Sequence, residues 1–122
     1  MPRVTWFEMS AGDPKRAMKF YEKVFGWKFQ KWGEQEYWLA ETGEKAEPGI
    51  DGAIMPKKEN YPLVVNTIGV KDIDETIRKI EKNGGKIVVP KMEVPMQGTL
   101  AYFMDTEGVV TGIMQPLPNA TM

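Results

Sequence analysis

The sequence contains neither cysteine nor histidine. Without cysteine there can be no disulfide, no thiolate metal ligand and no thiol nucleophile. Without histidine the chain lacks the commonest ligand of transition metals and the commonest general base near neutral pH. The two absences together exclude the serine–histidine–aspartate and cysteine–histidine arrangements of nucleophilic enzymes. Any metal site would have to be built from oxygen ligands alone.

Strong net charge and long apolar runs are missing as well. Sixteen basic residues are offset by seventeen acidic ones, which leaves a net charge of -1, so we expect neither nucleic acid nor a membrane as partner. There is no run of 18 apolar residues, and the N-terminus is strand-like, so a cytoplasmic location is expected. A chain of 122 residues is predicted to form one domain over residues 1–122.

The clearest element is a helix predicted between Asp13 and Gly26. Asp13 can accept a hydrogen bond from the first free backbone N–H groups, and Pro14 suits the first helical position. Gly26 can adopt the left-handed conformation that ends a helix. An apolar stripe at helical spacing is formed by Ala17, Phe20, Tyr21 and Val24.

The frame of this helix recurs later in the chain, where Asp72 aligns with Asp13 and Gly85 with Gly26. Asp72 and Glu75 have the spacing of a capping box, and an apolar stripe is formed by Ile73, Ile77 and Ile80. In each half we expect one strand before the helix and three after it. The expected strands are residues 4–9, 27–32, 36–41 and 50–55, then 63–70, 86–89, 99–104 and 110–114. Residues 90–98 are expected to form a loop that could fold over a ligand.

Two βαβββ modules, at about 3–58 and 61–117, therefore predict an α+β fold with a curled mixed sheet. The face of each sheet away from its helix must be buried by the partner module or enclose a ligand, which would make a cleft lined by inner strand faces. Whether the modules pair within one chain or swap between two chains stays open. The alternative to a repeat is two unrelated capped helices.

These features resemble the vicinal oxygen chelate superfamily, which includes glyoxalase I, bleomycin-resistance proteins and extradiol dioxygenases. The matching features are the N-terminal strand, Asp13-Pro14, Phe20-Tyr21, Phe25-Gly26-Trp27, residues 70–85 and the turn Asp105-Thr106-Glu107-Gly108. The resemblance covers nearly the whole chain and is closest to small single-domain proteins related to lactoylglutathione lyase. It implies paired βαβββ modules and a homodimer, but it says less about activity, because members catalyse several reactions or only bind ligands.

In metal-dependent members of that superfamily, the ligands project from inner strands of both modules. The resemblance places the first-strand ligand at Trp6 and its counterpart at Val65, or at Asn66 if the register shifts by one. The last-strand ligand falls on Gly112, and the remaining one lies in residues 52–55, which offer no ligating side chain. Tryptophan, valine and glycine cannot replace histidine and glutamate around a cation. We therefore expect no metal and no other cofactor, which argues against glyoxalase I or extradiol dioxygenase activity.

Glu8 is the acidic residue expected to face the cleft, because strand alternation places it on the same face as Trp6. A carboxyl group in such a cleft could act as a general acid or base. The alternative is a structural carboxylate that is hydrogen-bonded or reaches solvent at the strand end.

Aromatic residues on strands could line the cleft and stack on a flat or hydrophobic ligand, although such residues usually belong to a core. Thr67 could add a neutral hydrogen bond from the fifth strand. The predicted ligand-binding residues are Trp6, Glu8, Trp38, Val65, Thr67, Tyr102 and Gly112.

Three functions stay open at this point. The leading hypothesis is a metal-free protein of the glyoxalase/bleomycin-resistance type that holds an unidentified small molecule in the cleft. The second is a metal-independent lyase or isomerase that uses Glu8 as general acid or base. The third is a non-catalytic interaction module whose cleft is closed. Whether the protein is an enzyme is therefore undecided.

Overall fold

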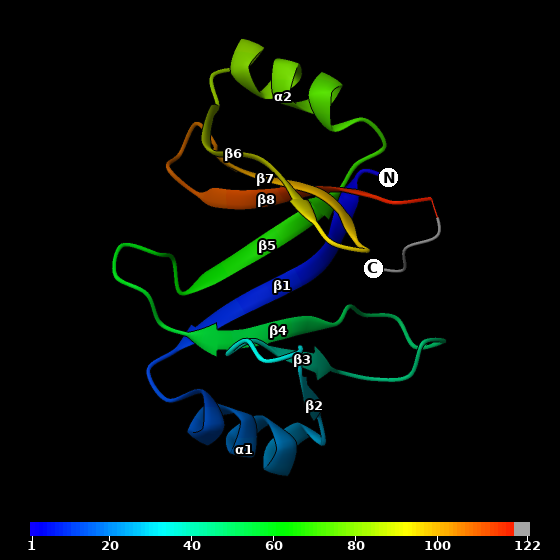
Figure 1. Ribbon diagram of the computed structural model, residues 1–122, viewed down its shortest axis with the longest axis vertical. Helices are drawn as coiled ribbons and strands as arrows, with labels where there is room; N and C mark the ends of the chain where they lie inside the picture. The colour runs from blue at the N-terminus through cyan, green and yellow to red at the C-terminus, as the bar shows by residue number, and fades with distance from the viewer. Residues whose placement is uncertain (119–122) are drawn as a thin grey trace. The chain divides into compact units, whose positions relative to one another are not determined.

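A computed structural model describes residues 1–118 of the chain (Figure 1). The elements follow one another as β1 (Arg3–Ala11), α1 (Pro14–Phe25), β2 (Lys28–Lys31), β3 (Trp38–Glu41), β4 (Gly52–Pro56), β5 (Val64–Gly69), α2 (Ile73–Lys82), β6 (Lys86–Val94), β7 (Gly98–Met104) and β8 (Val110–Pro116). The predicted α+β class and the repeated order of strand, helix and three strands are confirmed. Within the described part of the chain, neither helix is long and apolar enough to cross a lipid bilayer.

The chain folds into two compact units, which we name after their helices. The α1 unit is Trp6–Val65, and the α2 unit is Met1–Thr5 together with the chain from Asn66 onward. In the α1 unit the strand order is β2-β3-β4-β1, with β1 and β4 parallel and the other pairs antiparallel. In the α2 unit the order is β5-β8-β7-β6, with β5 and β8 parallel and the other pairs antiparallel.

The two faces of β1 differ in the way that strand alternation predicts. The ring of Phe7 lies 5.9 Å from that of Trp27, which stacks on Tyr21 of α1 at 4.8 Å. Phe7 therefore faces the helix, and its neighbours Trp6 and Glu8 point to the opposite face.

Helix α1 begins and ends where its sequence predicts. The Oδ1 atom of Asp13 accepts a hydrogen bond from the backbone N–H of Arg16 at 3.1 Å, and Gly26 has a φ of 73°. The predicted apolar stripe is only partly correct. Ala17 and Tyr21 are half-buried, but Phe20 and Val24 are 57% and 55% exposed. A stripe read from spacing alone is wider than the strip of helix that its sheet covers.

The core of the α2 unit forms between its helix and its sheet. Buried Val70, Ile73, Ala101 and Ile113 make the centre, and Ile68, Ile77, Ile80 and Phe103 pack against it. The predicted stripe of three isoleucines on α2 is therefore confirmed. The Asp72 cap is confirmed as well, because its Oδ1 accepts from the backbone N–H of Glu75 at 3.0 Å.

The loop predicted for residues 90–98 is wrong over most of its length. Strand β6 continues to Val94, with register irregularities on either side of Val89, and residues 95–97 alone make the turn into β7. Pro90 suggested an end to the strand, but β6 is the last strand in its order, where a missing backbone N–H is tolerated. The segment is part of a β-hairpin, so it does not form the loop that was expected to fold over a ligand.

Candidate functional site

Four side chains on the face of the α1 unit opposite its helix form a hydrogen-bonded network centred on Glu8. The Tyr37 hydroxyl donates to Glu8 Oε2 at 2.6 Å, and the Tyr61 hydroxyl donates to Glu8 Oε1 at 3.2 Å. The indole N–H of Trp6 donates to the Tyr37 hydroxyl oxygen at 3.1 Å. All four residues are half-buried. Glu8 is thus the acceptor for two phenols from distant parts of the chain.

Strand pairing explains how Tyr37 reaches Glu8. Glu8 pairs with Ala53 of β4, and Ala53 pairs with Leu39 of β3. Leu39 therefore shares a face with Glu8, and Tyr37 lies two residues before Leu39, so it returns to that face. The contact could have been found from alternation, had the pairing of β3 with β4 been known.

Tyr61 is placed by the connection after β4. The backbone N–H of Ser10 donates to the carbonyl of Leu63 at 2.8 Å, and the Ser10 hydroxyl donates to the carbonyl of Pro62 at 3.3 Å. These bonds hold the connection against β1, two residues beyond Glu8. Nothing in the local pattern around Tyr61 predicts this position, so sequence reasoning missed it.

In this network the Tyr37 phenol is the hydrogen-bond donor and the Glu8 carboxylate is the acceptor. Burial, followed by the negative charge of Glu8, raises the pKa of Tyr37 well above its usual value. The phenol therefore stays protonated at neutral pH and acts as a donor. A separation of 2.6 Å lies in the range of a charge-assisted O–H···O⁻ bond. The arrangement can hold a polar ligand atom beside a fixed carboxylate and a fixed phenol.

One further aromatic side chain and a lysine lie beside this network. The rings of Trp32 and Tyr37 meet edge-on with centroids 5.8 Å apart, and the backbone N–H of Trp32 donates to the carbonyl of Tyr37 at 2.9 Å. The Nζ atom of Lys58 lies 5.9 Å from the centre of the Tyr61 ring. We refer to Trp6, Glu8, Trp32, Tyr37 and Tyr61 as the Glu8 cluster.

Trp38 lies on the other face of the same sheet. It pairs with Ile54, which pairs with Met9, and Met9 shares the face of Phe7. The Nζ atom of Lys31 lies 6.0 Å from the Trp38 ring. The structure therefore does not bring Trp38 to Glu8.

Three other predicted residues meet in the α2 unit. Gly112 pairs with Thr67 on β5 and with Tyr102 on β7, and all three are buried. A Cβ atom at position 112 would lie 2.8 Å from the Thr67 hydroxyl oxygen and 3.2 Å from the Tyr102 ring. These two side chains thus fill the space above Gly112. Val65 is fully buried on β5.

The positions that the superfamily resemblance assigns to metal ligands do not fit a cation. The indole of Trp6 offers only an N–H donor, which is directed at Tyr37. Val65 is aliphatic, and the space above Gly112 has no room for a longer side chain without displacement of Thr67. Among residues 1–118, no three acidic side chains lie close enough together to hold a metal ion.

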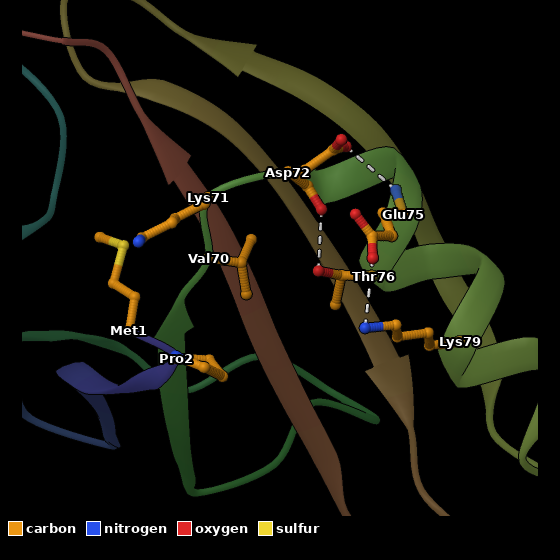
Figure 2. A pocket seen from close by; sticks show the side chains of 8 residues that line it. All are labelled: Met1, Pro2, Val70, Lys71, Asp72, Glu75, Thr76 and Lys79. Atoms are coloured by element: carbon orange, nitrogen blue, oxygen red, sulfur yellow. Dashed lines mark hydrogen bonds and ion pairs between the residues drawn. The ribbon is translucent and has the colours of Figure 1, made fainter.

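A separate hollow of about 180 Å³ lies in the α2 unit beside the start of α2 (Figure 2). Several of its polar groups are bonded to one another: Lys79 pairs with Glu75 at 3.2 Å, and the Thr76 hydroxyl donates to the Asp72 carbonyl at 2.9 Å. Asp72 also caps the helix. The hollow is lined by Met1, Pro2, Val70, Lys71, Asp72, Glu75, Thr76 and Lys79. These bonds serve the helix, and we assign the hollow no function.

Comparison with known proteins shows which family the chain resembles. Residues 3–113 match the family described as the Glyoxalase/Bleomycin resistance protein/Dioxygenase superfamily. A glyoxylase-like domain-containing protein of Didymella fabae is 32% identical over 112 residues, which cover 87% of this chain and 88% of that protein. CFP32 of Mycobacterium bovis, a glyoxylase by its name, is 27% identical over 115 residues. That match covers 90% of this chain but 44% of CFP32, so the chain spans less than half of that relative.

Among solved structures, the methylmalonyl-CoA epimerase of Streptomyces coelicolor, determined with 2-nitronate-propionyl-CoA, is similar to this chain with a TM-score of 0.70. The match covers 100% of this chain and 99% of the epimerase, at 15% sequence identity. At that identity the likeness concerns the fold alone.

Proposed function

Because the chain belongs to the glyoxalase/bleomycin resistance protein/dioxygenase superfamily, we propose that it binds a small organic molecule, without a metal ion, on the face of the α1 unit opposite its helix. The observation that carries the proposal is the Glu8 cluster. It combines a carboxylate, two phenols and two indoles on one face of the α1 unit. Few polar groups among apolar and aromatic ones are typical of small-molecule sites.

The chemistry at Trp6 supports binding without a metal. The superfamily resemblance places a metal ligand at this position in metal-dependent members. Here the side chain donates a hydrogen bond to Tyr37, which in turn donates to Glu8. A chain of hydrogen bonds therefore orders this face. A ligand would be oriented by Glu8 and would bury an apolar part against the rings.

The test is a ligand screen that reads the Trp6 indole directly. In ¹⁵N-labelled protein, a bound ligand should shift the Trp6 Nε1–H resonance, because this group lies inside the network. Acyl-CoA thioesters belong in the screen, since the structurally similar epimerase was solved with one such analogue, along with metabolites and antibiotics.

The matched control is Trp38→Phe, on the opposite face of the sheet. We expect Trp6→Phe to weaken binding of any hit and Trp38→Phe to leave it unchanged. The proposal fails if no compound shifts the Trp6 resonance, or if the two variants weaken binding equally.

A metal-independent lyase or isomerase is the second candidate, and one contact favours it. The Tyr37 phenol fixes the Glu8 carboxylate through a 2.6 Å hydrogen bond, so a half-buried proton acceptor is held in position for a ligand on this face. Glu8→Gln should then preserve the fold but abolish turnover of a substrate found in the screen. Unchanged turnover in that variant would eliminate Glu8 as the acid or base.

Superfamily membership also supports a homodimer. Sedimentation equilibrium should give about twice the chain mass of 13.9 kDa. A single species at the chain mass over the micromolar range would contradict this part of the proposal.

A further inference from the structure

Glu8 places a negative charge among aromatic rings. Its two carboxylate oxygens accept hydrogen bonds from Tyr37 and Tyr61, and O–H donors satisfy a carboxylate without cancelling its charge. The faces of aromatic rings carry negative potential as well. Both components of the cluster therefore attract cations and repel anions.

A cation of the chain itself already lies against this cluster. The Nζ atom of Lys58 is 5.9 Å from the centre of the Tyr61 ring, within the roughly 6 Å over which cation–π attraction operates. Lys58 is an exposed residue of the connection after β4. An ammonium group that could remain in solvent is thus found beside the ring that bonds to Glu8.

The geometry points to an ammonium group as the feature that this site recognises. We propose that the Glu8 cluster binds the cationic end of an alkylammonium or quaternary ammonium compound, in the place where Lys58 now approaches Tyr61. This inference rests on the proposed small-molecule binding and adds the charge of the ligand. Carboxylates and aromatic rings together are suited to such groups, because the rings match the apolar surface of the cation and Glu8 balances its charge.

Choline and 3,3-dimethylbutan-1-ol are suitable probes, because they share a shape and differ in a positive nitrogen against a neutral carbon. Each would be titrated into ¹⁵N-labelled protein while the Trp6 Nε1–H resonance is followed. We expect choline to bind roughly two- to thirtyfold more tightly than the neutral alcohol, as cation–π attraction with partial desolvation implies.

Three variants separate the parts of the argument. Glu8→Gln keeps the shape but removes the charge, so the preference for choline should fall to the part that the aromatic rings supply alone. Lys58→Met removes the internal cation, so choline should bind at least about twofold more tightly. Lys31→Met is the matched control, because Lys31 lies at a similar 6.0 Å from the Trp38 ring on the opposite face of the sheet. Its choline affinity should equal that of the wild type.

The outcomes distinguish this inference from the broader proposal. Equal binding of choline and the alcohol, or a preference that Glu8→Gln does not reduce, overturns recognition of the cation by the Glu8 cluster and leaves small-molecule binding intact. Cation recognition is likewise overturned if choline does not bind but a neutral compound of the screen shifts the Trp6 resonance. If neither probe and no screened compound shifts that resonance, both proposals fall together.

Discussion

The bond between Tyr37 and Glu8 should contribute measurably to stability. Removing the phenol oxygen in Tyr37→Phe deletes a 2.6 Å bond to a carboxylate and takes from the Trp6 indole its acceptor at 3.1 Å. Hydrogen bonds to charged groups contribute about 1.5–3 kcal/mol and neutral ones about 1 kcal/mol. Together the two bonds would contribute about 2.5–4 kcal/mol. Because the residues are half-buried, we expect the lower part of that combined range, a loss of about 2.5–3 kcal/mol in the free energy of unfolding.

Tyr61→Phe provides the matched comparison. It removes a phenol bonded to the same carboxylate, but at 3.2 Å, and it leaves the Trp6 bond in place. At 3.2 Å this bond is longer than a charge-assisted O–H···O⁻ bond, so we expect the loss of a weak bond, about 1 kcal/mol. Urea unfolding at pH 7, followed by tryptophan fluorescence, measures both values under the same conditions.

A double-mutant cycle isolates the pair itself. Glu8→Gln keeps an acceptor of similar shape and removes the charge, so Tyr37→Phe should cost less in that background. We expect a coupling free energy of about 1–2 kcal/mol, within the range found for residues in direct contact. A coupling below about 0.5 kcal/mol, which additive sites also show, would refute the account of the network. The account would also be refuted if Tyr37→Phe were no less stable to urea than Tyr61→Phe.

Three further predictions concern other features. The raised pKa of Tyr37 stabilises the fold below pH 10 and loses this effect above it, because the unfolded chain then releases the proton first. In alkaline urea titrations the wild type should therefore lose about 1.4 kcal/mol per pH unit more than Tyr37→Phe, and parallel curves would contradict this. Gly52→Ala should lower the free energy of unfolding by more than about 2 kcal/mol, since its Cβ would collide with the Phe7 backbone oxygen and ring. Gly12→Ala, with open space around its Cβ, should change it by less than about 0.5 kcal/mol, and equal losses in chemical denaturation would refute the packing argument. Met96→Gly should raise the melting temperature through a gain of about 0.5–1 kcal/mol, because Met96 is held at a φ of 67°, and a lower melting temperature would show that its side chain makes a stabilising contact.

Local signals predicted the helices well. Asp13 and Asp72 both cap their helices through a bond to the backbone N–H three residues later, and Gly26 has the left-handed conformation that ends α1. These features need contacts within one helical turn only. Burial of the stripe on α1 was predicted less well, since the exposure of Phe20 depends on how much of the helix its sheet covers.

The strands show where local patterns mislead. Pro90 suggested a loop, but its place on an edge strand lets β6 continue past it. Conversely, alternation along β1 correctly put Trp6 and Glu8 opposite Phe7, because side-chain direction in a strand depends on the backbone alone.

Some residues of the candidate site could be predicted from the sequence and others could not. Glu8 and Trp6 could be singled out from the sequence, whereas Tyr37 and Tyr61 could not, because strand pairing and the connection after β4 bring them to Glu8. Thr67 and Tyr102 meet at Gly112, while Trp38 lies on the opposite face from Glu8. The roles of all these residues in binding stay predictions, as does the assignment of residues 1–122 to one domain.

The sequence by itself determined the helix caps, the repeated βαβββ order and the lack of histidine and cysteine ligands, since composition and contacts within a few residues decide these. Only the tertiary structure decided that Glu8 is held by two phenols and that Trp6 bonds to Tyr37. Those contacts join residues that lie far apart in the chain. Their geometry depends on which strands pair and in what register, and no short stretch of sequence specifies that.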